Sequence, residues 1–120
     1  MPFNVTVSER EAGMALVAPA GSIDTTTSPV LETHVDAVLR GAPRVLVFDM
    51  SGVDYISSAG LRVIIKAKQI LAPKGGKVML VHLRPRVKRV FEIIKALPPE
   101  AVFESVEEMD AYLDGIQRKI

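Results

Sequence analysis

The sequence contains no cysteine and no tryptophan, and only 5% of its 120 residues are aromatic. Without a thiol, the chain forms no disulfide, no thiolate metal site and no cysteine nucleophile. It also has no apolar stretch approaching 18 residues, and residues 1–5 show no basic region followed by an apolar run. These absences exclude thiol redox chemistry and predict a soluble, cytoplasmic protein.

Groups that enzymes use for catalysis are also scarce. His34 and His82 are the only histidines; the first falls within a predicted helix and the second near the end of an apolar strand, which favours structural roles. The sequence has no His-x-x-x-His, Gly-x-Ser-x-Gly or Gly-x-Gly-x-x-Gly motif. Residues 75–77 (Gly-Gly-Lys) resemble part of a phosphate loop, but Leu71 and Val78 replace its first glycine and its Ser or Thr. We therefore predict no enzyme activity, no metal site and no cofactor.

The net charge of +1 conceals an uneven distribution. Residues 1–61 carry 3 basic and 7 acidic residues, residues 62–95 carry 10 and 1, and residues 96–120 carry 2 and 6. A basic block of this kind is compatible with nucleic-acid binding, but it lacks a series of interleaved aromatic side chains for base stacking. Several of its residues also fall on the solvent side of predicted helices. We therefore expect a solvated face or an acidic protein partner, and no nucleic acid.

Apolar residues alternate between two spacings along the chain, which distinguishes strands from helices. Residues 3–7 and 14–18 have a period of two and predict a hairpin, because only a short turn joins them. Two further apolar runs, at residues 44–50 and 77–83, predict central strands covered on both faces. Pro19 has no N–H for a sheet ladder, so we expect it at the end of its strand or on an edge.

Helical spacing predicts four helices, separated by strands and turns. The first opens with Ser28 as cap and Pro29 in its first turn, and the last follows a capping box at residues 105–108. A short final strand is expected at residues 101–103. A hairpin followed by β-α-β units implies a mixed sheet with right-handed crossovers, whose sites usually lie at the carboxyl ends of the parallel strands. The two middle helices are expected from Ser58 to Leu71 and from Pro85 to Leu97.

Residues 49–62 form the segment richest in candidate functional residues. They leave a central strand, cross a polar loop and open the second helix. Ser58 lies where an N-cap belongs, because the apolar helical period starts three residues later at Leu61. A capping role alone is enough to account for a serine at this position. Ala59 and Gly60 add a functional interpretation, since small residues in a first helical turn let something approach the backbone closely.

Three motifs, in order, resemble those of the STAS domain family, which is shared by sulfate transporters and bacterial anti-sigma factor antagonists. Residues 56–63 (Ile-Ser-Ser-Ala-Gly-Leu-Arg-Val) resemble its signature at the start of the second helix. Residues 21–24 with Thr27 resemble the motif after the hairpin, and residues 85–91 the third motif. The resemblance implies an α/β fold with a STAS-type mixed β-sheet, in which an N-terminal hairpin and β-α-β units carry about four packed helices. Residues 1–120 are then a single STAS domain.

The resemblance also implies a regulatory function. Antagonists of this family take part in partner switching: they bind an anti-sigma factor that is also a serine kinase and thereby free a sigma factor or other target. The kinase phosphorylates one serine, which ends binding, and a PP2C-type phosphatase removes the phosphate. The matching position is Ser58. The family commonly has Asp immediately before that serine, where this chain has Ser57, so Ser57 stays as the less favoured acceptor.

Two other functions stay open for the same segment. One is an accessory subunit of an ABC-type transporter, which docks through the Ser58 loop without phosphotransfer; the other is a small nucleotide-binding module. In the preferred interpretation ATP and magnesium belong to the kinase, and the chain does not insert directly into a membrane. A turn or capping role explains Asp24 and Asp54 as well as a contact with the partner does. The predicted partner-binding residues are Asp24, Thr27, Asp54, Ser57, Ser58, Ala59, Gly60 and Arg62.

Overall fold

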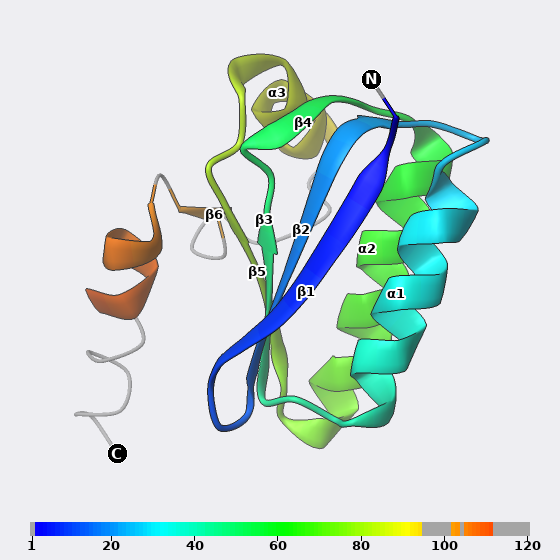
Figure 1. Ribbon diagram of the computed structural model, residues 1–120. Helices are drawn as coiled ribbons and strands as arrows, with labels where there is room; N and C mark the ends of the chain where they lie inside the picture. Colours follow the sequence, from blue (N-terminus) through cyan, green and yellow to red (C-terminus); the bar gives the residue numbers. More distant parts are fainter. Residues whose placement is uncertain (1, 95–101, 104, 112–120) are drawn as a thin grey trace.

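The computed structural model describes residues 2–94, 102–103 and 105–111 of the chain (Figure 1). Its strands are β1 (Asn4–Glu11), β2 (Met14–Ile23), β3 (Val45–Asp49), β4 (Gly52–Ile56), β5 (Lys77–Val81) and β6 (Val102–Phe103). Its helices are α1 (Ser28–Arg40), α2 (Ser58–Leu71), the short 3-10 helix η1 (Ala72–Lys74), α3 (Pro85–Ile94) and a final helical segment at residues 106–111.

The six strands form one mixed sheet in the order β1-β2-β3-β5-β6, with β4 paired to β2 beyond the end of β3. Only the β1–β2 hairpin is antiparallel; the other pairings are parallel. The sheet confirms the predicted combination of an N-terminal hairpin with β-α-β units. It also places the carboxyl ends of the parallel strands at one end of the molecule.

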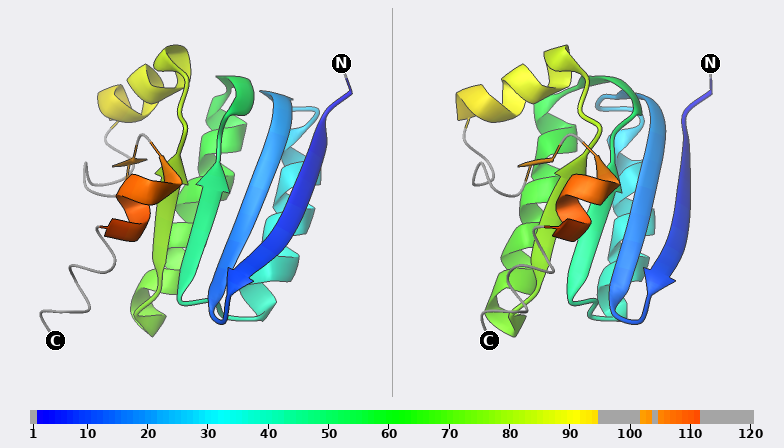
Figure 2. Two further views of the ribbon diagram at one scale, coloured as in Figure 1. Left: turned by 60° about the vertical axis from the view of Figure 1, so that its left-hand side comes forward. Right: turned by 90° about the vertical axis from the view of Figure 1, so that its left-hand side faces the viewer.

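The central strands are covered on both faces, as their continuous apolar runs predict. Helices α1 and α2 lie side by side on one face, and the segment 106–111 lies on the other (Figure 2). Successive residues of β3 point to opposite faces: Leu46 and Phe48 pack in the larger core with α1 and α2, whereas Val47 packs with Met109. The sheet is therefore the middle layer between two hydrophobic cores.

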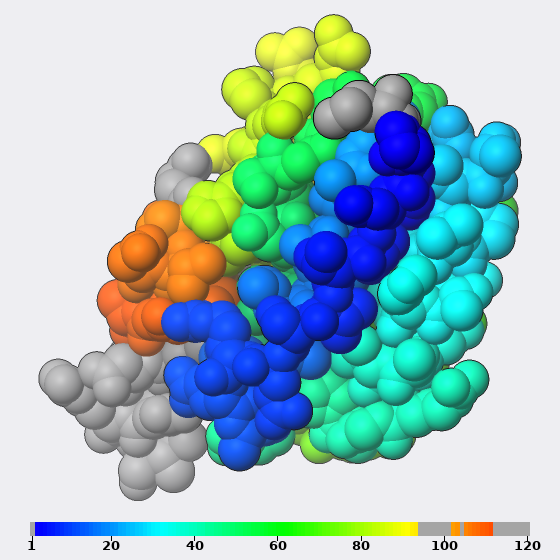
Figure 3. Space-filling view, viewed as in Figure 1, coloured from blue at the N-terminus to red at the C-terminus, as the bar shows by residue number. Residues whose placement is uncertain are grey.

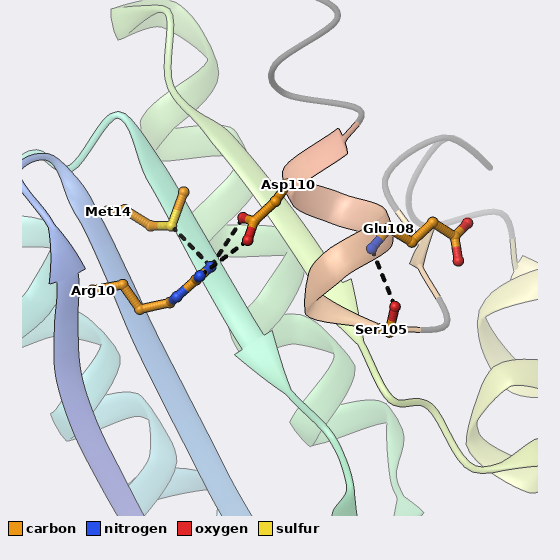
Figure 4. A network of polar contacts seen from close by, with 5 residues as sticks. All are labelled: Arg10, Met14, Ser105, Glu108 and Asp110. Carbon is orange, nitrogen blue, oxygen red and sulfur yellow. Dashed lines mark hydrogen bonds and ion pairs between the residues drawn. The ribbon is translucent and has the colours of Figure 1, made fainter.

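The hairpin turn also reaches the last described segment of the chain. Figure 3 shows the atoms of the turn in contact with those of the segment at residues 105–111. Both terminal nitrogens of Arg10 bond the Asp110 carboxylate, at 3.1 and 3.0 Å (Figure 4). The predicted capping of this segment is confirmed, because the Glu108 N–H donates to Ser105 Oγ at 3.1 Å. The expected continuation of this helix lies outside the described residues.

The prediction that Pro19 lies at a strand end or on an edge is wrong. Strand β2 continues to Ile23, and Pro19 lies in its interior opposite Val5 of β1. Residues 14–17 of β2 pair with β3, whereas residues 20–23 pair with β4. Pro19 therefore lies between the two ladders, where β2 is paired to neither β3 nor β4.

Strand β4 replaces part of the polar loop expected between the central strand and the second helix. It runs parallel to β2, but its register shifts by one residue: Val53 lies opposite Gly21, and Tyr55 lies opposite Ser22. Asp54 is thus the extra residue of a β-bulge. The bulge interrupts the alternation of buried and exposed side chains, which is why the period-two pattern is missing from the sequence.

Smaller differences concern helix boundaries. Thr27 is the N-cap of α1, one residue earlier than expected, and Pro29 lies in the first turn as predicted. The predicted end of the third helix at Leu97 lies outside the described residues, as does residue 101 of the final strand. Among the residues that the structure describes, no helix is both long enough and apolar enough to cross a membrane.

Candidate functional site

The candidate site lies where β2 and β4 end side by side. Ile23 pairs with Ile56 at the end of the ladder, and the Ser57 N–H continues it by donating to the Ile23 carbonyl at 2.8 Å. The loop that follows β2 and the first turn of α2 are therefore neighbours. This is the carboxyl end of the parallel strands, at the top of Figure 1.

Ser57, and not Ser58, is the N-cap of α2. Its backbone is extended, with φ −90° and ψ 172°, and its Oγ accepts a hydrogen bond from the Gly60 N–H at 3.3 Å. The predicted cap at Ser58 is wrong by one residue, because β4 holds Ser57 in the extended conformation that a cap requires. Ser57 occupies the position where the family commonly has Asp, and Ser and Asp are both favourable N-caps. The departure from the family pattern therefore preserves the capping of the helix.

Ser58 is the first residue of α2, and its side chain is exposed. Within the described part of the chain, its hydroxyl makes no hydrogen bond, whereas the Ser57 hydroxyl is engaged in the cap. The two neighbouring serines therefore differ in availability. A reagent or enzyme approaching from solvent meets the Ser58 hydroxyl without breaking a bond of the fold.

The close approach expected at position 60 is present, and it comes from within the protein. Gly60 is buried, and a Cβ built on it would lie 2.5 Å from Ile23 Cγ2 and 2.9 Å from Ile56 Cγ1. The groups that approach this backbone closely are thus side chains of the protein's own sheet. Gly60 lets the first turn of α2 pack directly on the ends of β2 and β4, and it thereby positions Ser58. Ala59, in contrast, is half-buried.

Asp24 and Thr27 form a closed turn between β2 and α1. Asp24 Oδ1 accepts from the N–H groups of Thr26 and Thr27, at 2.9 and 3.0 Å. In return, Thr27 Oγ1 accepts from the Asp24 N–H at 2.8 Å and donates to the Ser22 carbonyl at 2.7 Å. The bonds from the Thr27 and Thr26 N–H groups hold the pKa of the Asp24 carboxyl below its ordinary value. The turn explanation of Asp24 is therefore confirmed, and its carboxylate is charged at neutral pH.

Asp54 lies on the same end of the sheet, on the β4 bulge, and its side chain is exposed. It accepts a hydrogen bond from Ser22 Oγ at 2.9 Å. Beside it, Tyr55 exposes 47% of its surface. Neither Ser22 nor Tyr55 was predicted as a residue of this site. The two residues pair across β2 and β4, and the sequence pattern did not predict strand β4.

Arg62 lies one helical turn after Ser58, and its side chain is exposed. One turn further along α2, Lys66 Nζ lies 3.2 Å from Glu32 Oε2 and 3.3 Å from Asp36 Oδ1 of α1. The hydrogen bonds that the Lys66 ammonium donates, first to Glu32 and then to Asp36, raise the pKa of Lys66. One member of the basic block thus joins the two helices. The predicted site residues Asp24, Thr27, Asp54, Ser57, Ser58, Ala59, Gly60 and Arg62 all lie around the carboxyl ends of β2 and β4 and on the first two turns of α2.

A second polar cluster lies at the carboxyl ends of β3 and β5. His82 Nδ1 is 3.1 Å from Asp49 Oδ1, which also accepts from the Ser51 N–H at 3.0 Å. Burial alone would raise the pKa of Asp49, but the bonds from Ser51 and His82 outweigh it and leave this pKa below its ordinary value. Arg84 Nε donates to the Ser51 carbonyl at 2.9 Å. The cluster fixes the chain between β3 and β4 to the residues that lead into α3.

The sequence is similar to those of known proteins. The STAS domain matches residues 6–109 of the chain. BtrV of Bordetella bronchiseptica, provisionally named an anti-sigma factor antagonist, is 36% identical over 81 residues, which cover 68% of this chain and 70% of BtrV. The anti-sigma-B factor antagonist of Bacillus subtilis is 35% identical over 94 residues, covering 78% of this chain and 84% of that protein.

A solved structure extends the similarity to the fold. The crystal structure of an anti-sigma factor antagonist from Mycobacterium paratuberculosis superposes with a TM-score of 0.79 at 25% identity, covering 92% of this chain and 93% of the other. It thus shares the arrangement of strands and helices over nearly the whole chain. Together, the match over residues 6–109 and these relatives show that the protein belongs to the STAS domain family.

Proposed function

We propose that the protein is an anti-sigma factor antagonist in a partner-switching pathway, and that phosphorylation of Ser58 switches it off. The observation that carries the proposal is the difference between the two adjacent serines. Ser58 is exposed at the start of α2 with its hydroxyl available, while Ser57 is engaged as the cap. The names of the relatives from Bordetella bronchiseptica and Bacillus subtilis support the antagonist role.

The proposed partner is an anti-sigma factor with serine-kinase activity, which brings its own ATP and magnesium. In the transfer step, Ser58 Oγ attacks the γ-phosphorus of ATP as the bond to the β,γ-bridging oxygen breaks. ADP leaves, and the hydroxyl proton passes to a base on the kinase. A PP2C-type phosphatase later hydrolyses the phosphoester and restores the serine. The protein itself is the substrate of both enzymes, and the cycle runs in the cytoplasm.

The position of Ser58 explains how one phosphate ends binding without unfolding the protein. The phosphate adds about −1.5 to −2 charges at pH 7. At the first residue of a helix it meets free N–H groups and a favourable dipole, so the fold tolerates it. A partner docked over Ser58 must instead accommodate a dianion at its interface. This opposes binding wherever acidic or desolvated groups lie opposite.

The decisive experiment incubates the wild-type protein with a serine-kinase anti-sigma factor of the same organism and ATP, and measures intact mass. We expect the gain of one phosphoryl group in the wild type and in Ser57→Ala, and none in Ser58→Ala. Uptake by Ser58→Ala equal to that of the wild type would refute the assignment of the acceptor. Copurification of a permease or transport ATPase with no phosphoserine would instead favour the accessory role in a transporter.

The antagonist role itself is tested by binding. We expect the unphosphorylated protein to bind the kinase and Ser58→Asp to lose most of this binding. The control is Arg40→Ala. Arg40 is exposed and is the last residue of α1, at the end of that helix away from the Asp24 turn, so this variant is expected to bind like the wild type. Equal binding by Ser58→Asp and the wild type would contradict a switch at this serine.

A further inference from the structure

Arg62 and Ser58 share one exposed stripe of α2. They are four residues apart, and both side chains are exposed. Side chains at this spacing on a helix are neighbours, with about 5–6 Å between their Cβ atoms. Arg62 makes no hydrogen bond or ion pair with any other residue that the structure describes. In the described part of the chain, an arginine without a carboxylate partner therefore stands next to a serine whose hydroxyl makes no hydrogen bond.

Four carboxylates of α1, β4 and the turn after β2 have partners of their own. Glu32 and Asp36 of the adjacent helix α1 both bind Lys66. Asp24 closes its own turn, and Asp54 accepts from Ser22. The first turn of α2 contains no acidic residue. Before phosphorylation, none of the described residues pairs with this guanidinium.

We propose that Arg62 is the intramolecular counter-ion of the phosphate on Ser58. This inference rests on the proposed function, because it requires that Ser58 be phosphorylated. The guanidinium presents a planar fork of donors that matches two phosphate oxygens. An anion four residues before a cation is also the more favourable order along a helix. Lys66 is unsuited to the role, since it lies two turns from Ser58 and is held by α1.

The pairing gives the phosphate a second effect on binding. Before phosphorylation, the Arg62 side chain is available to an acidic group of a partner. After phosphorylation, the new dianion takes up the same guanidinium. One modification therefore adds negative charge to the surface and removes a positive contact from it.

The experiment follows the titration of the phosphoserine by phosphorus NMR in the phosphorylated wild type, Arg62→Ala and Arg62→Lys. A paired arginine favours the dianion, so the second pKa of the phosphate is expected to rise by about 0.2–0.4 unit in Arg62→Ala. The second pKa of the phosphate in Arg62→Lys should lie between those of the wild type and Arg62→Ala. The control is Lys74→Ala, which removes one exposed positive charge from η1 at the far end of α2 and should titrate like the wild type.

The possible outcomes separate this inference from the proposed function. Phosphorylation of Ser58 with identical titrations in the wild type and Arg62→Ala would overturn the counter-ion role and leave the proposed function standing. An equal rise in Arg62→Ala and Lys74→Ala would also overturn it, since net charge alone would then explain the shift. Absence of phosphate on Ser58 after the kinase reaction would overturn both.

Discussion

Gly60 lies so close to Ile23 that a Cβ built on the glycine would stand 2.5 Å from Ile23 Cγ2. Ile23 is fully buried at the end of β2, and its carbonyl also accepts the Ser57 N–H. The first turn of α2 is thus fixed to the end of the sheet by both packing and hydrogen bonding. This contact sets the position of Ser58 relative to the Asp24 turn.

Gly60→Ala is expected to destabilise the protein. The added methyl would meet Cγ2 of a buried, β-branched side chain, which cannot rotate away freely. Overpacking of this kind costs about 1–3 kcal/mol, which we expect to exceed the gain in helix propensity from Gly to Ala. The measurement is the free energy of unfolding in urea.

Gly41→Ala is the matched control for this substitution. Gly41 has φ −80°, and a Cβ there would meet only the Val38 carbonyl, at 3.4 Å. We expect a change within about 0.5 kcal/mol. If both substitutions cost the same free energy, close packing on Ile23 is not the reason for Gly60.

Replacing Ser57 and replacing Ser58 should change the stability of the protein by different amounts. Ser57→Ala removes the acceptor for the Gly60 N–H and is expected to cost about 1 kcal/mol. Ser57→Asp restores an N-cap and should recover most of that loss. Ser58→Ala should be nearly neutral, because its hydroxyl makes no bond with the described residues. Urea unfolding of the three variants decides the point; a larger loss in Ser58→Ala would assign the cap to the wrong serine.

The elements that the sequence predicts well are those whose pattern is local. The helices at residues 28–40 and 58–71 and the strands β3 and β5 each carry an uninterrupted apolar period, and the structure confirms them. The family motifs pointed to the candidate site, since they lie next to these elements. The one-residue error at the cap arose because Ser57 and Ser58 are chemically equivalent caps. The structure distinguishes them, because the Ser57 N–H bonds the Ile23 carbonyl at the end of the ladder and the Ser57 backbone is extended.

The features that the sequence did not predict depend on contacts between distant segments. Strand β4 escaped detection because the bulge at Asp54 places Val53 and Ile56, three residues apart, on the buried side. The interior position of Pro19 follows from the change of partner from β3 to β4 along β2. Neither the bulge nor the change of partner leaves a local pattern, so the exposed Tyr55 was missed with them.

Asp24 should make the stability of the protein depend on pH in the acidic range. Its folded pKa is lowered by the Thr27 and Thr26 N–H bonds, so the folded state binds this proton less readily than the unfolded chain. The stabilisation is complete above the unfolded pKa of about 3.9 and is lost as pH falls through the folded pKa. Asp24→Asn should therefore be less stable than the wild type at pH 7, with a difference that shrinks below about pH 4. Unfolding in urea between pH 7 and the acidic range measures the difference in unfolding free energy between the wild type and Asp24→Asn. A difference that does not change with pH would contradict a charge effect.

The helical segment at residues 106–111 should be held mainly by apolar burial. Met109 is fully buried against the sheet, so Met109→Ala is expected to cost about 2–5 kcal/mol. The Arg10–Asp110 pair is partly exposed, with 30% and 43% of the two side chains accessible (Figure 4). Arg10→Ala should therefore cost no more than about 1 kcal/mol. Thermal unfolding of the two variants compares the contribution of apolar burial with that of the ion pair. A greater loss of stability in Arg10→Ala than in Met109→Ala would show that the ion pair dominates.

Phosphorylation of Ser58 is expected to leave the fold intact and to stabilise it slightly. Ser58 is the first residue of α2, and the first turn contains no acidic group that would repel the phosphate. An anion at this position typically contributes about 0.3–1 kcal/mol, which corresponds to a rise in Tm of about 1–4 °C. Because the effect is electrostatic, it should shrink at high salt. Calorimetry of the phosphorylated and unphosphorylated protein at two salt concentrations tests this. A marked fall in Tm would mean that the phosphate disrupts the start of α2, and that the switch acts by local unfolding and not at the interface.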